Sequence, residues 1–366
     1  MHVSMKFNPN SIAIKNGHFF GFPCSLEESS IAILCVPWDV TTSYGDGTSL
    51  GPSSILEASY QVDLFSPYAV EHASASSSVE HASASSSKDG WKTLIGTAPI
   101  SKQWLKKNKD LRKKAKTYIS FLEKGRESLR KNLLKEINQG CETLHTEVEL
   151  ATTKLLNRKK RVVVLGGDHS VSIGALQALQ KKERFSILHI DAHADLRRDY
   201  EGFTHSHASI MYNALKLPNI ERITQIGIRD VSPEEVTLML NNPKIKTFWD
   251  WDLKEKKYEG VTWKKQCLEI IETLTENVYV SFDIDGLDPK YCPHTGTPVP
   301  GGLELGQVLY LLNLLVESGR KIIGADLVEV APQNTRGHTD SCSEWDCNVG
   351  ARVLYNLCLF IQKSFN

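Results

Sequence analysis

The chain has 366 residues, and its 43 basic and 43 acidic side chains give a formal net charge of zero. This balance creates no overall field that would draw the protein to nucleic acid or to an anionic membrane. No apolar run approaches the roughly 18 residues that a membrane-spanning helix needs. The first ten residues lack the apolar stretch of a signal peptide, and the eight cysteines show no paired spacing. We therefore expect a cytoplasmic protein with reduced thiols that binds neither nucleic acid nor membranes.

Short apolar runs alternate with helical patterns along the chain. The runs are interpreted as buried strands at residues 31–36, 161–165, 185–190, 223–228, 278–282 and 321–327. The clearest helical patterns lie between them at residues 172–181, 233–240, 264–275 and 305–318. Near-continuous apolar strands suit a parallel sheet that is buried on both faces. The alternation predicts an α/β fold with three α/β/α layers and a mostly parallel central sheet.

Two segments interrupt this alternation. The sequence Val-Glu-His-Ala-Ser-Ala-Ser-Ser-Ser begins at residue 70 and is repeated at once from residue 79. Its composition offers little to bury, which predicts a mobile surface loop, so we do not expect His72 or His81 to bind a metal. The second segment, residues 102–140, is rich in lysine and arginine, with apolar residues at helical spacing. It is interpreted as an amphipathic helical hairpin packed on the domain; an arm that binds nucleic acid or a partner is the alternative.

Six side chains that could bind a metal form three clusters, each directly after a predicted strand. The clusters are His169; Asp191, His193 and Asp195; and Asp283 and Asp285. In open parallel sheets, ligands bind beyond the carboxyl ends of the strands. In an extended segment, residues two positions apart project to the same side. An Asp-x-Asp pair alone is common in turns, but three clusters in the same context predict one site.

The ligand types indicate what kind of metal centre this is. Four carboxylates in one pocket would repel each other and would be largely protonated unless cations neutralised them. Carboxylates and imidazoles without thiolates favour manganese, with nickel, cobalt, iron or zinc as alternatives. Two such ions, about 3.5–4 Å apart, would share a water molecule and lower its pKa. The nearly neutral site that results favours a cationic substrate over a phosphate.

The three clusters stand in longer motifs that resemble the signatures of the arginase/agmatinase (ureohydrolase) family. The motifs are Gly-Gly-Asp-His-Ser from residue 166, Asp-Ala-His-Ala-Asp from residue 191 and Ser-Phe-Asp-Ile-Asp-Gly-Leu-Asp-Pro from residue 281. Further segments at residues 36–45, 295–302 and 326–332 are similar to the family's terminal elements. The resemblance covers most of residues 30–360, apart from about 70–140. It implies one ureohydrolase domain over residues 1–366, with an atypical serine-rich repeat and a charged helical insertion at about 70–140.

The family resemblance also implies a role for each residue of the site. Two manganese ions per subunit would be held by His169 with Asp195, by His193 with Asp285, and by Asp191 and Asp283 as bridging ligands. Glu329 would bind the substrate guanidinium, and Asp195 would help to stabilise the reaction intermediate. His207 would help to protonate the leaving amine and is preferred over its neighbour His205. His189 is expected to be a buried residue that supports the ligands.

The substrate within the family is inferred from one missing motif. Arginases carry a Ser-Gly-Asn stretch that binds the amino acid carboxylate, and residues 196–207 lack it. These residues, with Gly-Ile-Arg-Asp from residue 227, are similar to agmatinases, which convert agmatine to putrescine and urea for polyamine biosynthesis. We expect Asp199 and Glu201 at the mouth of the pocket, where Arg197 or Arg198 could still pair with a substrate carboxylate.

Several alternatives remain open at this stage. A guanidinobutyrase, guanidine hydrolase, arginase or formimidoylglutamase would use the same ligands, and a single-zinc deacetylase would need only about three of them. A non-catalytic regulatory homologue would be marked by lost ligands, and none of the six is lost. The resemblance further implies a homotrimer or homohexamer.

Overall fold

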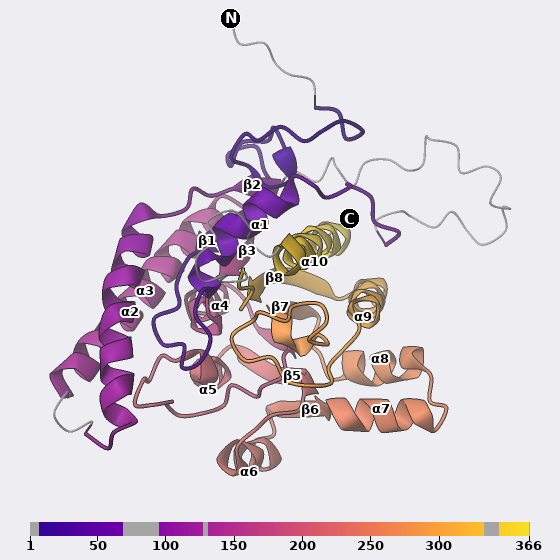
Figure 1. Ribbon diagram of the computed structural model, residues 1–366. Coiled ribbons are helices and arrows are strands. Elements are labelled where there is room, and N and C mark those ends of the chain that lie inside the picture. The colour runs from indigo at the N-terminus through magenta and orange to yellow at the C-terminus, as the bar shows by residue number, and fades with distance from the viewer. Residues whose placement is uncertain (1–6, 69–94, 127–130, 333–343, 366) are drawn as a thin grey trace, which may run out of the picture.

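The computed structural model describes residues 7–68, 95–126, 131–332 and 344–365 (Figure 1). The tandem repeat and its two histidines lie outside these residues. Within them, eight strands form one sheet, all parallel, in the order β2-β1-β3-β8-β7-β4-β5-β6. The strands are β1 (Ile31–Val36), β2 (Ile95–Thr97), β3 (Arg161–Gly166), β4 (Phe185–Ile190), β5 (Ile220–Ile228), β6 (Ile245–Trp249), β7 (Asn277–Asp283) and β8 (Lys321–Val328).

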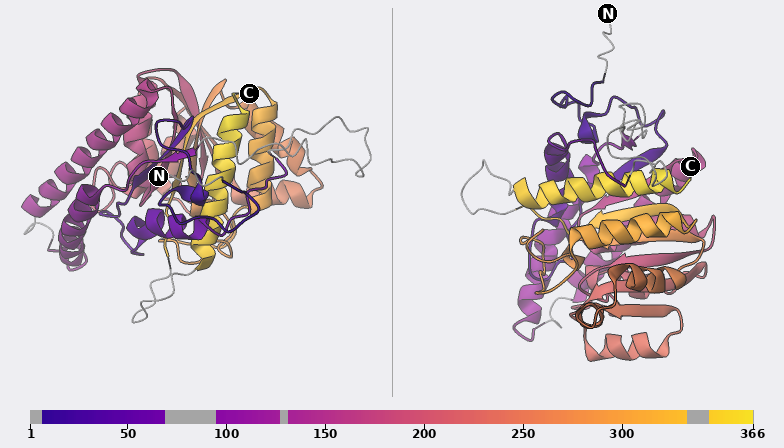
Figure 2. Two further views of the ribbon diagram at one scale, coloured as in Figure 1. Left: turned by 90° about the horizontal axis from the view of Figure 1, so that it is seen from above. Right: turned by 90° about the vertical axis from the view of Figure 1, so that its right-hand side faces the viewer.

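The helices cover both faces of this sheet. They are α1 (Gly51–Ser59), α2 (Lys102–Leu122), α3 (Lys131–Asn157), α4 (Ser172–Gln180), α5 (Ile210–Ala214), α6 (Pro233–Asn241), α7 (Asp250–Tyr258), α8 (Trp263–Glu272), α9 (Leu305–Glu317) and α10 (Glu344–Lys363). The α2–α3 pair and α10 lie on opposite sides of the molecule (Figure 2).

The layers follow from the alternation of side chains along each strand. In β1, Ile31 and Ile33 point into a core shared with α8, α9 and α10. Ala32 and Leu34 point the other way, into a core shared with α2 and α3. All four side chains are at most 5% exposed. Burial on both faces explains why the strand is apolar throughout and confirms the three-layer prediction.

The sequence predicted six of the eight described strands and missed the two at the edges of the sheet. β2 has only three residues, too few to produce a pattern. β6 pairs with one neighbour, and its residues Lys246 and Thr247 are not buried, so it lacks the continuous apolar run of a central strand. An edge strand needs less apolar surface than a central one. A search for apolar runs in the sequence therefore detects an edge strand less well than a central strand.

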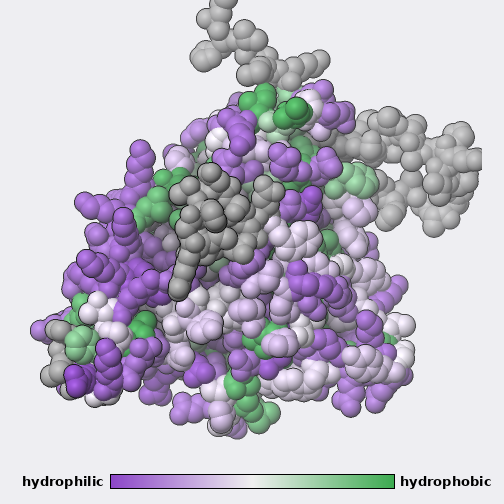
Figure 3. Space-filling model, viewed as in Figure 1, coloured by the Kyte–Doolittle hydropathy of each residue, from purple (hydrophilic) through white to green (hydrophobic). Residues whose placement is uncertain are grey.

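The predicted helical hairpin at residues 102–140 is confirmed, although its second helix continues to Asn157. The faces of α2 and α3 that point inward bury apolar side chains such as Tyr118, Ile137 and Leu144. The surface over these helices is mostly hydrophilic (Figure 3). Most of the charged residues of the segment thus lie on the solvated side of a packed hairpin, whereas Arg112 points inward with 12% of its side chain exposed.

In the described part of the chain, no helix is both long and apolar enough to cross a membrane.

Candidate metal centre and pocket

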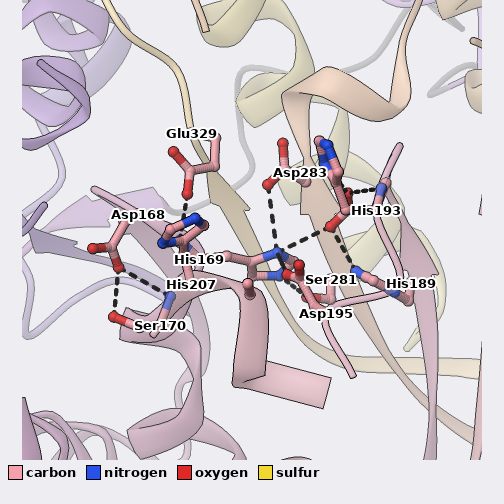
Figure 4. Close-up of polar contacts among 12 residues, drawn as sticks. Asp168, His169, Ser170, His189, His193, Asp195, His207, Ser281, Asp283 and Glu329 are labelled. Atoms are coloured by element: carbon pink, nitrogen blue, oxygen red, sulfur yellow. Dashed lines mark hydrogen bonds and ion pairs between the residues drawn. The ribbon is translucent and has the colours of Figure 1, made fainter. Parts of the chain in front are cut away.

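The candidate ligands lie beyond the carboxyl ends of four neighbouring strands. β3 leads to His169, β4 to Asp191, β7 ends at Asp283, and Glu329 follows β8. These strands are adjacent in the order β3-β8-β7-β4. Since parallel strands end at the same edge of a sheet, segments more than 100 residues apart in sequence meet there. The close-up in Figure 4 shows Glu329, His169, Asp283 and His193 gathered at this edge.

The described residues contain two groups of side chains that could hold a metal ion, and the first surrounds His169. Its members are His169, His189, Asp191 and Asp195, all buried, with ligand atoms within 4.8 Å of one another. The Nδ1 atom of His169 lies 3.1 Å from Asp195 Oδ2 and 3.2 Å from Asp191 Oδ2. It also lies 3.4 Å from Asp283 Oδ2. One imidazole nitrogen therefore faces three carboxylates.

The opposite edge of the His169 ring is fixed by a hydrogen-bond chain. Its Nε2 lies 2.8 Å from Ser281 Oγ, and Ser281 Oγ lies 3.0 Å from Asp326 Oδ2. With Ser281 donating to the Asp326 carboxylate, Ser281 Oγ accepts from the Nε2–H of His169. Nδ1 is then the nitrogen that would bind a metal ion after losing its proton, and it is buried without a hydrogen-bond partner. This is how proteins orient a histidine that binds a metal.

The second group consists of Asp191, His193 and Asp285. His193 Nδ1 lies 3.1 Å from Asp285 Oδ2 and 3.5 Å from Asp191 Oδ1. Asp191 thus directs Oδ2 to the first group and Oδ1 to the second, as a ligand shared by two ions would. Asp283 faces His169 of the first group, and its Oδ1 accepts from the backbone N–H of Asp285, 2.9 Å away.

The acid–base properties of these groups fit cations between them. Burial and the charges of Asp285 and Asp191 raise the pKa of Asp283 well above its usual value. Burial and Asp191 raise the pKa of Asp195 to about 6. Burial lowers the pKa of His193, but the carboxylates of Asp285 and Asp191 outweigh it and raise the pKa well above its usual value. When divalent cations bind to such carboxylates and imidazoles, these side chains release their protons to the solvent. The donor set fits such ions.

His189 supports Asp191 from behind, which is where the sequence placed it. Its Nε2 lies 2.8 Å from Asp191 Oδ2, and its Nδ1 lies 3.0 Å from Gln225 Nε2. Gln225 Nε2 also donates to the carbonyl of Ala194, 2.8 Å away, which identifies this atom as the amide nitrogen. His189 Nδ1 is therefore an acceptor, and its Nε2–H donates to Asp191. This contact fixes the orientation of the shared carboxylate.

Backbone strain marks two of the candidate residues. Asp195 has φ 54° and Glu329 has φ 61°, in the left-handed region that side chains other than glycine seldom adopt. Each such residue costs about 1–3 kcal/mol, and such residues concentrate at functional sites. The Gly-Gly turn before His169 is equally constrained, because a Cβ atom on Gly167 would lie 2.0 Å from the carbonyl oxygen of Trp38. No pattern in the sequence indicated the strained carboxylates.

A cavity of about 160 Å³ opens onto the two groups. This is smaller than the roughly 300–1,000 Å³ of sites for drug-sized ligands, so it suits a small substrate. Its lining residues are Ser43, His193, Asp195, Arg197, Tyr200, His207, Ala208, Asp230, Val231, Glu235, Asp283, Asp285, Thr297 and Glu329. Three of the carboxylates, those of Asp195, Asp283 and Asp285, belong to candidate ligands that bound cations would neutralise. The carboxylates of Asp230, Glu235 and Glu329 outnumber the one arginine, so the cavity stays acidic with the ions in place.

The acidic residues at the mouth differ from those that the sequence suggested. Asp199 and Glu201 do not line the cavity, whereas Asp230 and Glu235 do. Asp230 follows β5 and is joined to His193 by an isolated parallel bridge, which brings its strand end beside the candidate metal ligands. In the sequence, the segment Gly-Ile-Arg-Asp from residue 227 indicated only a similarity to agmatinases and not a place in the pocket. Its position after a strand was the signal that could have placed Asp230 in the pocket.

The two histidine candidates are separated by the fold. His207 lines the cavity, whereas His205 packs its ring edge-on against His145, with ring centroids 4.8 Å apart. Burial, with the imidazoles of His193 and His169, lowers the pKa of His207 to about 3. His207 is therefore neutral near pH 7 and able to accept a proton.

Comparisons with known proteins agree with this geometry. The family model described as Arginase family matches residues 29–357. An N(1)-aminopropylagmatine ureohydrolase of Thermus thermophilus is 30% identical over 309 residues, covering 84% of this chain and 84% of the relative. An agmatinase of Halalkalibacterium halodurans is 29% identical over 307 residues, covering 84% and 85%. The crystal structure of agmatine ureohydrolase of Thermoplasma volcanium has a TM-score of 0.64 at 24% identity and covers 94% of each chain, a likeness of fold.

Proposed function

The chain belongs to the arginase family, whose members named above are ureohydrolases, and we propose that its substrate is agmatine, released as putrescine and urea. The observation that carries this proposal is the acidic cavity that is lined by members of both ligand groups and by the carboxylate of Glu329. A cavity this acidic is complementary to a cation, and agmatine carries one at each end.

Glu329 is proposed to bind the guanidinium group. Burial, with the charge of Asp168, raises the pKa of Glu329 well above its usual value. Its ionised form therefore needs a cation beside it. The side chain is anchored, because Oε1 accepts a hydrogen bond from the backbone N–H of His169, 2.9 Å away. The remaining lone pairs of the carboxylate can accept two parallel N–H donors, which is the favoured geometry of a guanidinium–carboxylate pair.

The chemistry at the base of the pocket would then be divided among named residues. Two manganese ions, held by the six ligands, would supply an activated water molecule there. Asp195 lines the cavity beside this point, and its carboxylate would stabilise positive charge on the guanidinium nitrogens. His207 lines the same cavity and is neutral, so it would accept a proton that the activated water molecule gives up and would pass it to the nitrogen of the leaving amine.

The mouth of the pocket is proposed to select the other end of the substrate. The Asp230 side chain is 67% exposed there and would face the distal ammonium of agmatine. Arg197 is already engaged, with Nε 3.7 Å from Glu235 Oε2 and its guanidinium 4.9 Å from the centre of the Tyr200 ring. Pairing with the carboxylate of arginine would compete with these contacts of Arg197.

We accordingly expect kcat/KM for agmatine to exceed that for arginine by at least about a hundredfold. The reason is that an unpaired substrate carboxylate beside Asp230 and Glu235 would cost several kcal/mol of binding free energy. Urea release should be measured with agmatine, arginine, 4-guanidinobutyrate and guanidine, each over a range of concentrations. The 4-guanidinobutyrate arm is the matched control, since it replaces the distal ammonium with a carboxylate. Equal rates on agmatine and arginine would contradict the assignment.

N(1)-aminopropylagmatine is the second candidate substrate. It is the substrate named for the Thermus relative, and it extends agmatine by one more cationic group. The exposed carboxylate of Asp230 favours either compound over arginine. A kcat/KM that is higher for N(1)-aminopropylagmatine than for agmatine would move the assignment to the longer substrate.

We also propose that the enzyme is a homotrimer or homohexamer, as the family resemblance implies.

A further inference from the structure

The α2–α3 hairpin contacts two of the loops that carry cavity residues. The first loop, residues 39–49, follows β1 and contains Ser43. The second loop, residues 197–207, follows the Asp-Ala-His-Ala-Asp segment and contains His207. Nothing in the proposed chemistry uses the hairpin, and its charged composition first indicated a solvated surface. The inward face of the hairpin, however, carries polar side chains that form hydrogen bonds with these two loops.

Arg112 of α2 holds the first loop with its whole guanidinium group. Its Nη1 donates to the carbonyls of Val40 and Thr42, 3.1 and 2.5 Å away, and its Nε donates to Asp46 Oδ1, 2.9 Å away. Only 12% of the side chain is exposed. These partners lie on both sides of Ser43, so the arginine fixes the backbone that carries this residue to the cavity.

Asn108, one turn earlier on α2, completes the attachment of the first loop. Asn108 and Asp39 form two reciprocal hydrogen bonds of 2.8 Å, one to the backbone and one between side chains. The far end of the loop is pressed against the opposite wall of the cavity. A Cβ atom on Gly45 would lie 2.7 Å from the Cα of Gly296, next to Thr297, which lines the cavity.

Asn138 of α3 holds the second loop in a similar way. Its Nδ2 donates to the carbonyl of Gly202, 3.0 Å away, and its Oδ1 accepts from the N–H of Thr204, 3.1 Å away. Between these two contacts, Phe203 is fully buried and packs against Tyr118 of α2, with ring centroids 5.4 Å apart. His207 lies three residues beyond this anchored turn.

We propose that the α2–α3 hairpin positions the active-site pocket, with Arg112 holding the loop of Ser43 and Asn138 holding the loop of His207. This inference rests on the proposed function for its kinetic consequences. Both are positioning residues, since neither lines the cavity. Arg112 sets the shape of the wall that the substrate meets, so its loss should act on KM. Asn138 sets the place of the proton-carrying imidazole, so its loss should act on kcat.

The test compares Arg112→Ala and Asn138→Ala with Lys113→Ala and Thr143→Ala, which are matched changes on the exposed faces of the same helices. We expect KM for agmatine to rise roughly tenfold in Arg112→Ala, and kcat to fall roughly tenfold in Asn138→Ala, because small misplacements are costly at reacting groups. Bound manganese should stay at the wild-type level in all four. Arg112→Lys keeps a positive charge for Asp46, so its KM should lie between those of Arg112→Ala and the wild type. Control-like kinetics in both variants, or loss of metal, would overturn the inference.

Amide hydrogen exchange gives a readout that needs no substrate. Exchange should accelerate in residues 39–48 only for Arg112→Ala, and in residues 200–207 only for Asn138→Ala. If neither loop changes, or if exchange accelerates throughout the protein, the hairpin does not position these loops. If the loop-specific pattern holds but the wild type releases no urea from any guanidino compound, the proposed function fails while the positioning role stands.

Discussion

Asp191→Asn is expected to abolish urea release and to lower manganese affinity by more than the roughly 10–100-fold lost when a supporting residue of a metal site is changed. The carboxylate directs one oxygen to each ligand group, at 3.2 Å from His169 Nδ1 and 3.5 Å from His193 Nδ1. Asparagine keeps the shape of the side chain but removes the charge and replaces one acceptor with a donor. A single substitution would therefore remove one ligand oxygen and the negative charge that both ions share.

The measurement is metal content after reconstitution, together with urea release from agmatine. Asp283→Asn should behave in the same way, because its carboxylate also faces His169. Asp199→Asn is the matched control: this aspartate is exposed and does not line the cavity. Wild-type turnover in Asp191→Asn would show that the two groups do not share this residue.

Glu329→Gln is expected to keep both metal ions and to lower kcat/KM by roughly two to three orders of magnitude or more. Removing one partner of a desolvated charge pair costs about 2–5 kcal/mol. Glutamine can still accept the hydrogen bond from the N–H of His169, so the turn after β3 should stay in place. The loss should therefore appear in catalysis and not in folding.

For this variant, melting temperature and metal content are measured beside the kinetics, with the exposed Glu259→Gln as control. Unchanged melting and metal content with a large drop in kcat/KM would support a guanidinium-binding role. Turnover close to that of the wild type would rule this role out.

The sequence predicted which side chains lie together at the candidate metal centre, because each cluster is a local motif after a buried strand. In a parallel sheet, the residues that directly follow the strands lie at the same edge, and this does not depend on how the helices pack. His189 could be placed behind Asp191 for the same reason, since the two are neighbours in sequence. The central strands were equally clear, because burial on both faces leaves a continuous apolar run.

The cavity wall was not predictable in the same way. Ser43, Asp230 and Thr297 come from three separate loops, and their meeting depends on how each loop packs. Asp199 and Glu201 were expected at the mouth because they follow the metal motif directly. The chain turns there instead, with Glu201 at φ 55°, so that the next residues meet α2 and α3. The contacts of Arg112 join residues about 70 positions apart, which no local pattern indicates.

The most direct test of a two-metal ureohydrolase is elemental analysis of the manganese-reconstituted protein, combined with urea release from agmatine at each metal loading. We expect two ions per chain at saturation, because four carboxylates and two imidazoles are too many and too acidic for one ion. Urea release should reach its maximum only when the second ion is bound. Saturation at one ion per chain, with full activity, would contradict the account.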